Sequence, residues 1–115
     1  MSAAKTLFQR ICEREIPADI VYEDEHCIAF RDINPQAPLH LLVVPRRPIP
    51  SLAEVQTGDE ALLGHLLVVV ARLAEQLDMQ GGFRTVINTG RDGGQTVDHL
   101  HIHVLAGRTL RWPPG

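Results

Sequence analysis

Residues 99–105 read His-Leu-His-Ile-His-Val-Leu, so an imidazole recurs at every second position with an aliphatic side chain between. A β-strand directs successive side chains to opposite faces of its sheet. The stretch therefore predicts a strand with its aliphatic side chains in the core and with His99, His101 and His103 in a row on the other face. Protonated imidazole binds phosphate oxygens and neutral imidazole attacks electrophiles. Acyl or phosphoryl transfer is the chemistry that such a row favours.

A metal site is the main alternative for these histidines. Two imidazoles on one strand can share a zinc ion, and His40 could supply another ligand. No carboxylate is expected beside them, because Asp98 should face away from His99. His101 has an imidazole on either side, so it is the candidate nucleophile, and His99 and His103 are expected to support it.

The composition of the chain limits the classes to which it can belong. A length of 115 residues, 44% hydrophobic and 22% charged, predicts one small domain over residues 1–115. A net charge of −3 gives no general attraction for nucleic acid. Only two cysteines occur, Cys12 and Cys27, and no secretory leader precedes Phe8, which favours a cytoplasmic setting. The most apolar window, residues 66–70, is too short to span a membrane.

Two helices and five strands are predicted along the chain. A short amphipathic helix is expected at about residues 6–13. A long helix is expected to begin at the capping-box pattern of residues 57–60, to carry apolar residues at helical spacing as far as Leu77, and to end at Gly81-Gly82. Short apolar runs bounded by turn residues predict the strands, at 20–22, 27–30, 40–44, 83–88 and 99–105.

Strands in runs, without strict alternation with helices, are typical of the α+β class. We expect a mostly antiparallel sheet with helix on one face and the other face free for chemistry. The apolar stripe of the long helix is wider than one small sheet needs, which favours helix pairing in a homodimer. This stripe comprises Leu63, Leu66, Leu67, Val70 and Leu73. His65 is interpreted as an ordinary surface or interface residue. The glycine-rich residues 89–95 form either a tight hairpin connection or a turn whose N–H groups hold a phosphate.

The histidine stretch resembles the His-φ-His-φ-His-φ-φ signature of the histidine triad (HIT) family, where φ is hydrophobic. Segments in the same order resemble the Hint branch of that family, the nucleoside phosphoramidases, from about residue 8 to residue 115. They are residues 15–18, 32–38, 62–66, 92–95 and 112–115. The resemblance implies a HIT-like α+β fold, with a five-stranded mostly antiparallel sheet, a long helix and a short N-terminal helix. It also implies a homodimer whose sheet continues across the two-fold through residues 83–88.

The activity implied by the resemblance is hydrolysis of the P–N bond of purine nucleoside 5′-phosphoramidates, with aminoacyl adenylates as further candidate substrates. His101 would attack the α-phosphorus, expel an amine and form a nucleotidyl-histidine that water resolves to AMP or GMP. The resemblance implies neither a metal nor a cofactor. His103 would contact phosphate oxygens, the backbone carbonyl of His99 would orient the ring of His101, and His40 would support the three histidines.

The same resemblance assigns the nucleotide pocket. Asp32 would accept hydrogen bonds from the ribose hydroxyls, and Asn88 and Thr96 would lie at the phosphate and leaving group. The apolar base slot would comprise Phe8, Ile16, Phe30 and Ile33. Gly94 and Gln95 belong to the motif expected beside the phosphate. The tail that contains Trp112 would form a wall of the partner subunit's site.

Two features depart from the family pattern. Residues 6–9 read Thr-Leu-Phe-Gln where relatives with structural zinc carry C-x-x-C, so structural zinc is not expected. Thr96 and Asn34 stand where close relatives often have serine. The alternative function is a non-catalytic nucleotide-binding or partner-binding module.

Overall fold

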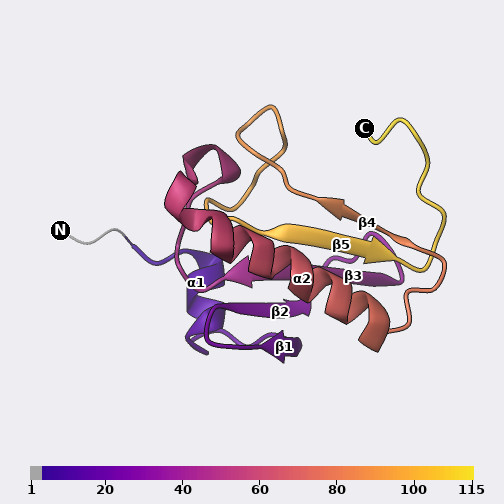
Figure 1. Cartoon of the computed structure of the whole chain (residues 1–115), viewed down its shortest axis with the longest axis horizontal. Helices are drawn as coiled ribbons and strands as arrows, with labels where there is room; N and C mark the ends of the chain where they lie inside the picture. The colour runs from indigo at the N-terminus through magenta and orange to yellow at the C-terminus, as the bar shows by residue number, and fades with distance from the viewer. Residues whose placement is uncertain (1–3) are drawn as a thin grey trace.

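The computed structural model describes residues 4–115 and contains two α-helices and five strands (Figure 1). In chain order they are α1 (Leu7–Cys12), β1 (Ile20–Glu23), β2 (Cys27–Arg31), β3 (Leu39–Pro45), α2 (Glu60–Gln76), β4 (Phe83–Val86) and β5 (Ile102–Ala106). Two short 3-10 turns, Leu52–Glu54 and Thr57–Asp59, connect β3 to α2. The α+β class and the succession of elements predicted from the sequence are confirmed.

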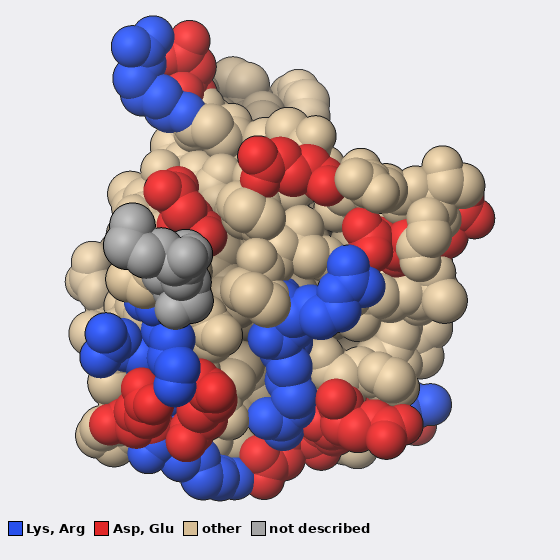
Figure 2. All heavy atoms as spheres, turned by 90° about the vertical axis from the view of Figure 1, so that its left-hand side faces the viewer, with Lys and Arg blue, Asp and Glu red and all other residues tan. Residues whose placement is uncertain are grey.

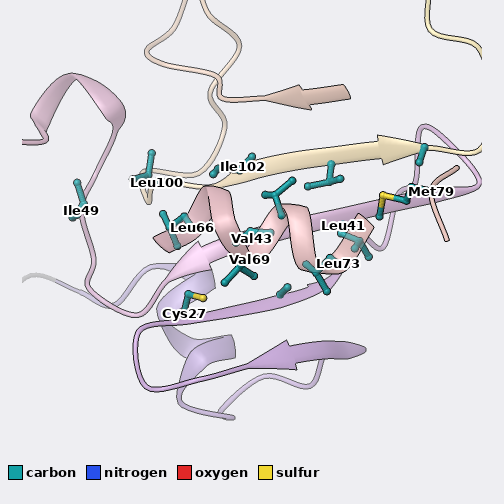
Figure 3. Packing of buried hydrophobic residues seen from close by; sticks show 14 residues of the cluster. Cys27, Leu41, Val43, Ile49, Leu66, Val69, Leu73, Met79, Leu100 and Ile102 are labelled. Atoms are coloured by element: carbon teal, nitrogen blue, oxygen red, sulfur yellow. The ribbon is translucent and has the colours of Figure 1, made fainter. Parts of the chain in front are cut away.

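The strands form one sheet in the order β1-β2-β3-β5-β4, and every neighbouring pair is antiparallel. Because side chains alternate along a strand, β2 and β3 contribute to a core on each face. Cys27, Ala29, Leu41 and Val43 pack in the cluster that includes the buried face of α2 (Figure 3). The alternate residues of the same strands pack with Phe8, Ile11 and Cys12 of α1. The face expected to be free is therefore partly covered by α1.

The histidine stretch is strand only in its second half, because β5 begins at Ile102 and not at residue 99. Residues 99–101 bond to irregular backbone instead: the N–H of His99 donates to the Val97 carbonyl, and the N–H of Leu100 donates to the Ile49 carbonyl. Leu100, Ile102 and Val104 are nevertheless buried in the α2-side core, as predicted. The expected strand 83–88 is likewise shorter and ends at Val86.

The long helix starts and ends differently from the prediction. Its N-terminus is preceded by a 3-10 turn in which the N–H of Gln56 donates to the Asp59 carboxylate at 2.9 Å, so the capping pattern of residues 57–60 is not the one used. The helix ends at Gln76, before the two glycines. Asp78 adopts a left-handed backbone (φ 58°), and the N–H of Met79 bonds back to the Ala74 carbonyl, which closes the helix.

The apolar stripe assigned to a dimer contact is divided by the structure. Leu66, Val70 and Leu73 are buried against the helix's own sheet, and Leu63 packs against the same cluster. Only Leu67 of this stripe is mostly exposed, at 53%. The buried side chains of α2 pack in one cluster with residues of β2, β3 and β5, so the width of the stripe does not by itself indicate a partner. No helix within residues 4–115 has the length and apolar character needed to cross a membrane.

Candidate active site

A cavity of about 270 Å³ lies between α1 and the sheet. Two of the three histidines of residues 99–103 line it, namely His101 and His103, together with Asp32 and Thr96. Three larger surface hollows, of about 650, 660 and 810 Å³, contain none of the three. The chemistry-bearing residues thus converge on the smallest of these spaces, which is also mostly apolar in its lining.

The ring of His99 is buried away from this cavity, contrary to the expected row on one face. Its Nε2 lies 2.8 Å from the Pro45 carbonyl, which can only accept, so Nε2 carries the proton. Its Nδ1 then accepts from the Thr6 hydroxyl at 2.6 Å. Burial lowers the pKa of His99 and keeps the ring neutral. The side chain of His99 therefore anchors the segment, and both of its nitrogens are occupied.

The backbone of His99 has a second role, because its carbonyl lies 2.7 Å from Nδ1 of His101. A carbonyl accepts only, so Nδ1 of His101 carries the proton and Nε2 keeps its lone pair. Phe8 packs with its ring edge-on to this imidazole, at a centroid distance of 4.9 Å. The ring of His101 is thus held in the tautomer that a nucleophile requires.

A chain of two hydrogen bonds sets the tautomer of His103. The backbone N–H of Gln36 donates to Nδ1 of His40 at 3.0 Å, so the proton of His40 is on Nε2. That Nε2 lies 2.9 Å from Nδ1 of His103, which must accept. Nε2 of His103 therefore carries the remaining proton. Burial, with smaller contributions from His101 and His40, lowers the pKa of His103 to about 4, so the ring is a neutral donor at neutral pH.

Asp32 both stabilises a turn and lies at the cavity wall. Its Oδ1 accepts from the Asn34 N–H at 2.9 Å, which stabilises the turn after β2. Its Oδ2 lies 3.5 Å from Nε2 of His40, and the residue also lines the cavity. The carboxylate therefore places negative charge at the cavity wall. One of its two oxygens already accepts a hydrogen bond from the backbone.

The apolar wall contains all four residues predicted for it, Phe8, Ile16, Phe30 and Ile33. Phe8 and Phe30 are buried and meet edge to face at 5.7 Å, whereas Ile33 is 98% exposed at the rim. Several lining residues were not foreseen, among them Ile11, Leu42 and Val97. Leu42 could have been found from strand alternation, since it pairs in register with His103.

Some predicted residues lie elsewhere in the described part of the chain. Thr96 lines the cavity, but Asn88, Gly94 and Gln95 are not part of its lining. The carboxamide of Gln95 closes its own loop: Oε1 accepts from the Gly90 N–H, and Nε2 donates to the carbonyls of Pro50 and Val97. The glycine-rich residues thus serve the hairpin connection in this structure. Trp112 is 82% exposed and lies outside the cavity.

The metal alternative takes a different form from the one expected. Ligand atoms of Asp32, His40 and His103 lie within 4.8 Å of one another, so a carboxylate does accompany two histidines. The facing nitrogens of His40 and His103 are, however, already joined by a hydrogen bond. A metal ion bound here would have to replace the proton that they share.

Comparison with known proteins identifies the family. The HIT domain model matches residues 13–110. An uncharacterized HIT-like protein of Synechococcus elongatus is 61% identical over 110 residues, which cover 96% of both chains. The crystal structure of a HIT family hydrolase from Legionella pneumophila matches with a TM-score of 0.95 and 44% identity, over 96% of this chain and 100% of that one. A histidine triad nucleotide-binding protein from Candida albicans matches with a TM-score of 0.81 and 28% identity, over 95% and 83%. The chain belongs to the HIT domain family and has the fold of HIT family hydrolases.

Proposed function

We propose that the protein is a nucleoside phosphoramidase, which hydrolyses the P–N bond of purine nucleoside 5′-phosphoramidates to a nucleoside monophosphate and an amine. The observation that carries the proposal is the pair of opposite tautomers at the cavity. His101 offers a lone pair on Nε2, and His103 beside it offers an N–H. An attacking nitrogen next to a hydrogen-bond donor suits attack on an anionic phosphorus centre.

In the first step Nε2 of His101 bonds to the α-phosphorus, and the P–N bond to the amine breaks with its electron pair leaving on nitrogen. The amine takes a proton from solvent as it departs. His101 is then positively charged, and the hydrogen bond from its Nδ1 to the His99 carbonyl stabilises that charge. In the second step water attacks phosphorus, loses a proton and displaces neutral His101. Nε2–H of His103 would donate to a non-bridging oxygen in both steps.

Nucleotide recognition would use the remaining walls of the cavity. An aromatic and aliphatic slot accepts a planar base with little demand on the edge of the base, so AMP and GMP derivatives should both bind. Asp32 would accept from the ribose hydroxyls, and Thr96 would face the leaving amine. Asn88, Gly94 and Gln95 would contribute the remaining phosphate contacts.

The working unit that we propose is a cytoplasmic homodimer whose two-fold joins the sheets through β4. This strand is at the end of the sheet and pairs only with β5 within residues 4–115. Phe83 on it is 44% exposed, and Leu67 of α2 is also exposed. The tail with Trp112 would then lie at the partner subunit's site. Sedimentation as a monomer at micromolar concentration, with full activity, would contradict this arrangement.

A direct assay separates the proposed enzyme from a non-catalytic nucleotide-binding module. Purified protein treated with a chelator is incubated with adenosine 5′-phosphoramidate, and release of AMP and ammonia is followed. We expect several turnovers per chain. Turnover of the guanosine and cytidine phosphoramidates is measured in the same way. A protein that binds AMP but turns over none of these substrates would be a binding module. Turnover that depends on an added divalent ion would favour the metal alternative.

A further inference from the structure

A second group of metal-ligand types lies outside the cavity, where α2 meets the turn between β1 and β2. It consists of Asp24 in that turn, Cys27 at the start of β2 and His65 of α2. One ligand atom from each, a carboxylate oxygen, Sγ and a ring nitrogen, lie within 4.8 Å of one another. Figure 3 shows Cys27 at the start of β2, beside the helix. None of the three lines the candidate active site.

The carboxylate of Asp24 is fixed by hydrogen bonds. Its Oδ1 accepts from the N–H groups of His26 and Cys27, at 2.8 and 2.9 Å. Its Oδ2 accepts from the Tyr22 hydroxyl and from Nε2 of His65, both at 2.7 Å. Burial acts to raise the pKa of Asp24, but these hydrogen bonds outweigh it and hold the pKa well below its ordinary value. An ionised oxygen is therefore already directed at the imidazole.

The thiol of Cys27 is the deepest of the three groups, with no exposed surface. Burial, with the negative charge of Asp24, raises its pKa to about 12, so the metal-free group is a thiol. A divalent cation beside it would reverse that effect, because the thiolate is the form that binds a metal. The cation can approach from the opposite side, where the side chains of His65 and Asp24 are 28% and 23% exposed.

The charged and aromatic groups around Asp24 and His65 leave room for a cation to approach these two side chains. The ring of His26 lies edge-on to that of His65 at a centroid distance of 5.3 Å and is half-exposed, and its Nε2 lies 3.2 Å from Oε1 of Glu25, so it would have to turn from Glu25 to supply a further nitrogen. Two cations lie near the group: Arg46 donates to the Asp24 carbonyl and pairs with Glu23, and Arg72 acts on the hydroxyl of Tyr22. Arg46 and Arg14 both pair with Glu23, which offsets part of their positive charge, and Figure 2 shows basic side chains flanked by acidic ones on one end of the molecule.

We propose that Asp24, Cys27 and His65 form a binding site for a divalent ion of the zinc class, with His26 or water as the fourth ligand. A carboxylate, a thiolate and imidazole in a tetrahedral arrangement suit Zn²⁺ and Co²⁺ better than Mg²⁺ or Ca²⁺. The ion replaces the hydrogen atom between His65 and Asp24. Cys27 releases its proton to solvent, and the proton of His65 moves from Nε2 to Nδ1. The bound ion then links α2 to the β1–β2 turn.

The test is a Co²⁺ titration of the full chain under reducing conditions. Tetrahedral Co²⁺ bound by a thiolate gives an intense sulfur-to-metal absorption band, and we expect this band to saturate at one ion per chain and to disappear when Zn²⁺ is added. The Cys12→Ser variant leaves Cys27 as the sole thiol. We expect this variant to keep the full band, which assigns the sulfur without requiring a Cys27 variant to fold.

Three further variants complete the assignment, each checked for folding by circular dichroism. Cys27→Ser should lose the sulfur band, and His65→Gln should weaken Co²⁺ binding at least about tenfold. His103→Gln should leave the band unchanged, which separates this site from the group at the cavity. A wild-type protein without the band would overturn the proposal. The same holds if the band is lost in Cys12→Ser, or if it is kept in Cys27→Ser.

Discussion

The hydroxyl of Thr6 performs two functions, so its removal should be unusually costly for a residue near the N-terminus. It donates to Nδ1 of the fully buried His99, and it accepts from the N–H of Gln9 as the N-cap of α1. An unpaired buried acceptor costs about 1–3 kcal/mol. A lost N-cap costs about 0.5–2 kcal/mol. For Thr6→Val we therefore expect the free energy of unfolding to fall by about 2–4 kcal/mol.

Urea denaturation measures this loss, and an unchanged m-value would show that the folded state is otherwise intact. Thr6→Ser keeps the hydroxyl and is the matched control, with an expected loss below about 1 kcal/mol. The His99 carbonyl holds the ring of His101, so Thr6→Val should also lower kcat more than it raises KM. A stability change below about 0.5 kcal/mol would refute the anchoring of His99 by Thr6.

Three further predictions concern the cavity and the tail. Burial lowers the pKa of His103 from 6.5 to about 4, so neutral His103 stabilises the fold above pH 6.5 and that contribution is lost as the pH falls toward 4. Urea denaturation across this range should show a shallower decline for His103→Gln, and equal slopes would contradict the assignment. Phe8→Ala should destabilise the protein by about 3–5 kcal/mol and raise KM for the nucleotide, measured by denaturation and steady-state kinetics. Deletion of residues 111–115 should change the relative kcat/KM among leaving amines more than AMP affinity, and uniform rates would argue against a shared site.

The parts of the fold that depend on periodicity could be predicted from the sequence. Alternating apolar residues located the strands, and helical spacing located α2, because burial on one face imposes those periods. The same alternation was misleading at His99. Its ring is turned toward Pro45 and Thr6, because residues 99–101 follow irregular backbone whose hydrogen bonds go to Val97 and Ile49.

Contacts between residues distant in the chain could not be predicted in this way. His65 was interpreted as a surface or interface residue, yet it bonds to Asp24, 41 positions earlier. The tautomer of His103 depends on a backbone N–H at Gln36, to which no side-chain pattern points. The position of α1 over the second face was also missed, because a helix of six residues carries little periodic signal.

His101 is proposed to form a covalent bond to the nucleotide, and this intermediate can be trapped. Protein is mixed with a phosphoramidate labelled at the α-phosphorus and quenched within one turnover. We expect acid-labile label on the wild-type chain and none on His101→Ala. The variant should still bind AMP but turn over at least about a thousandfold more slowly. Near-normal turnover by His101→Ala, or label retained on it, would show that His101 is not the nucleophile.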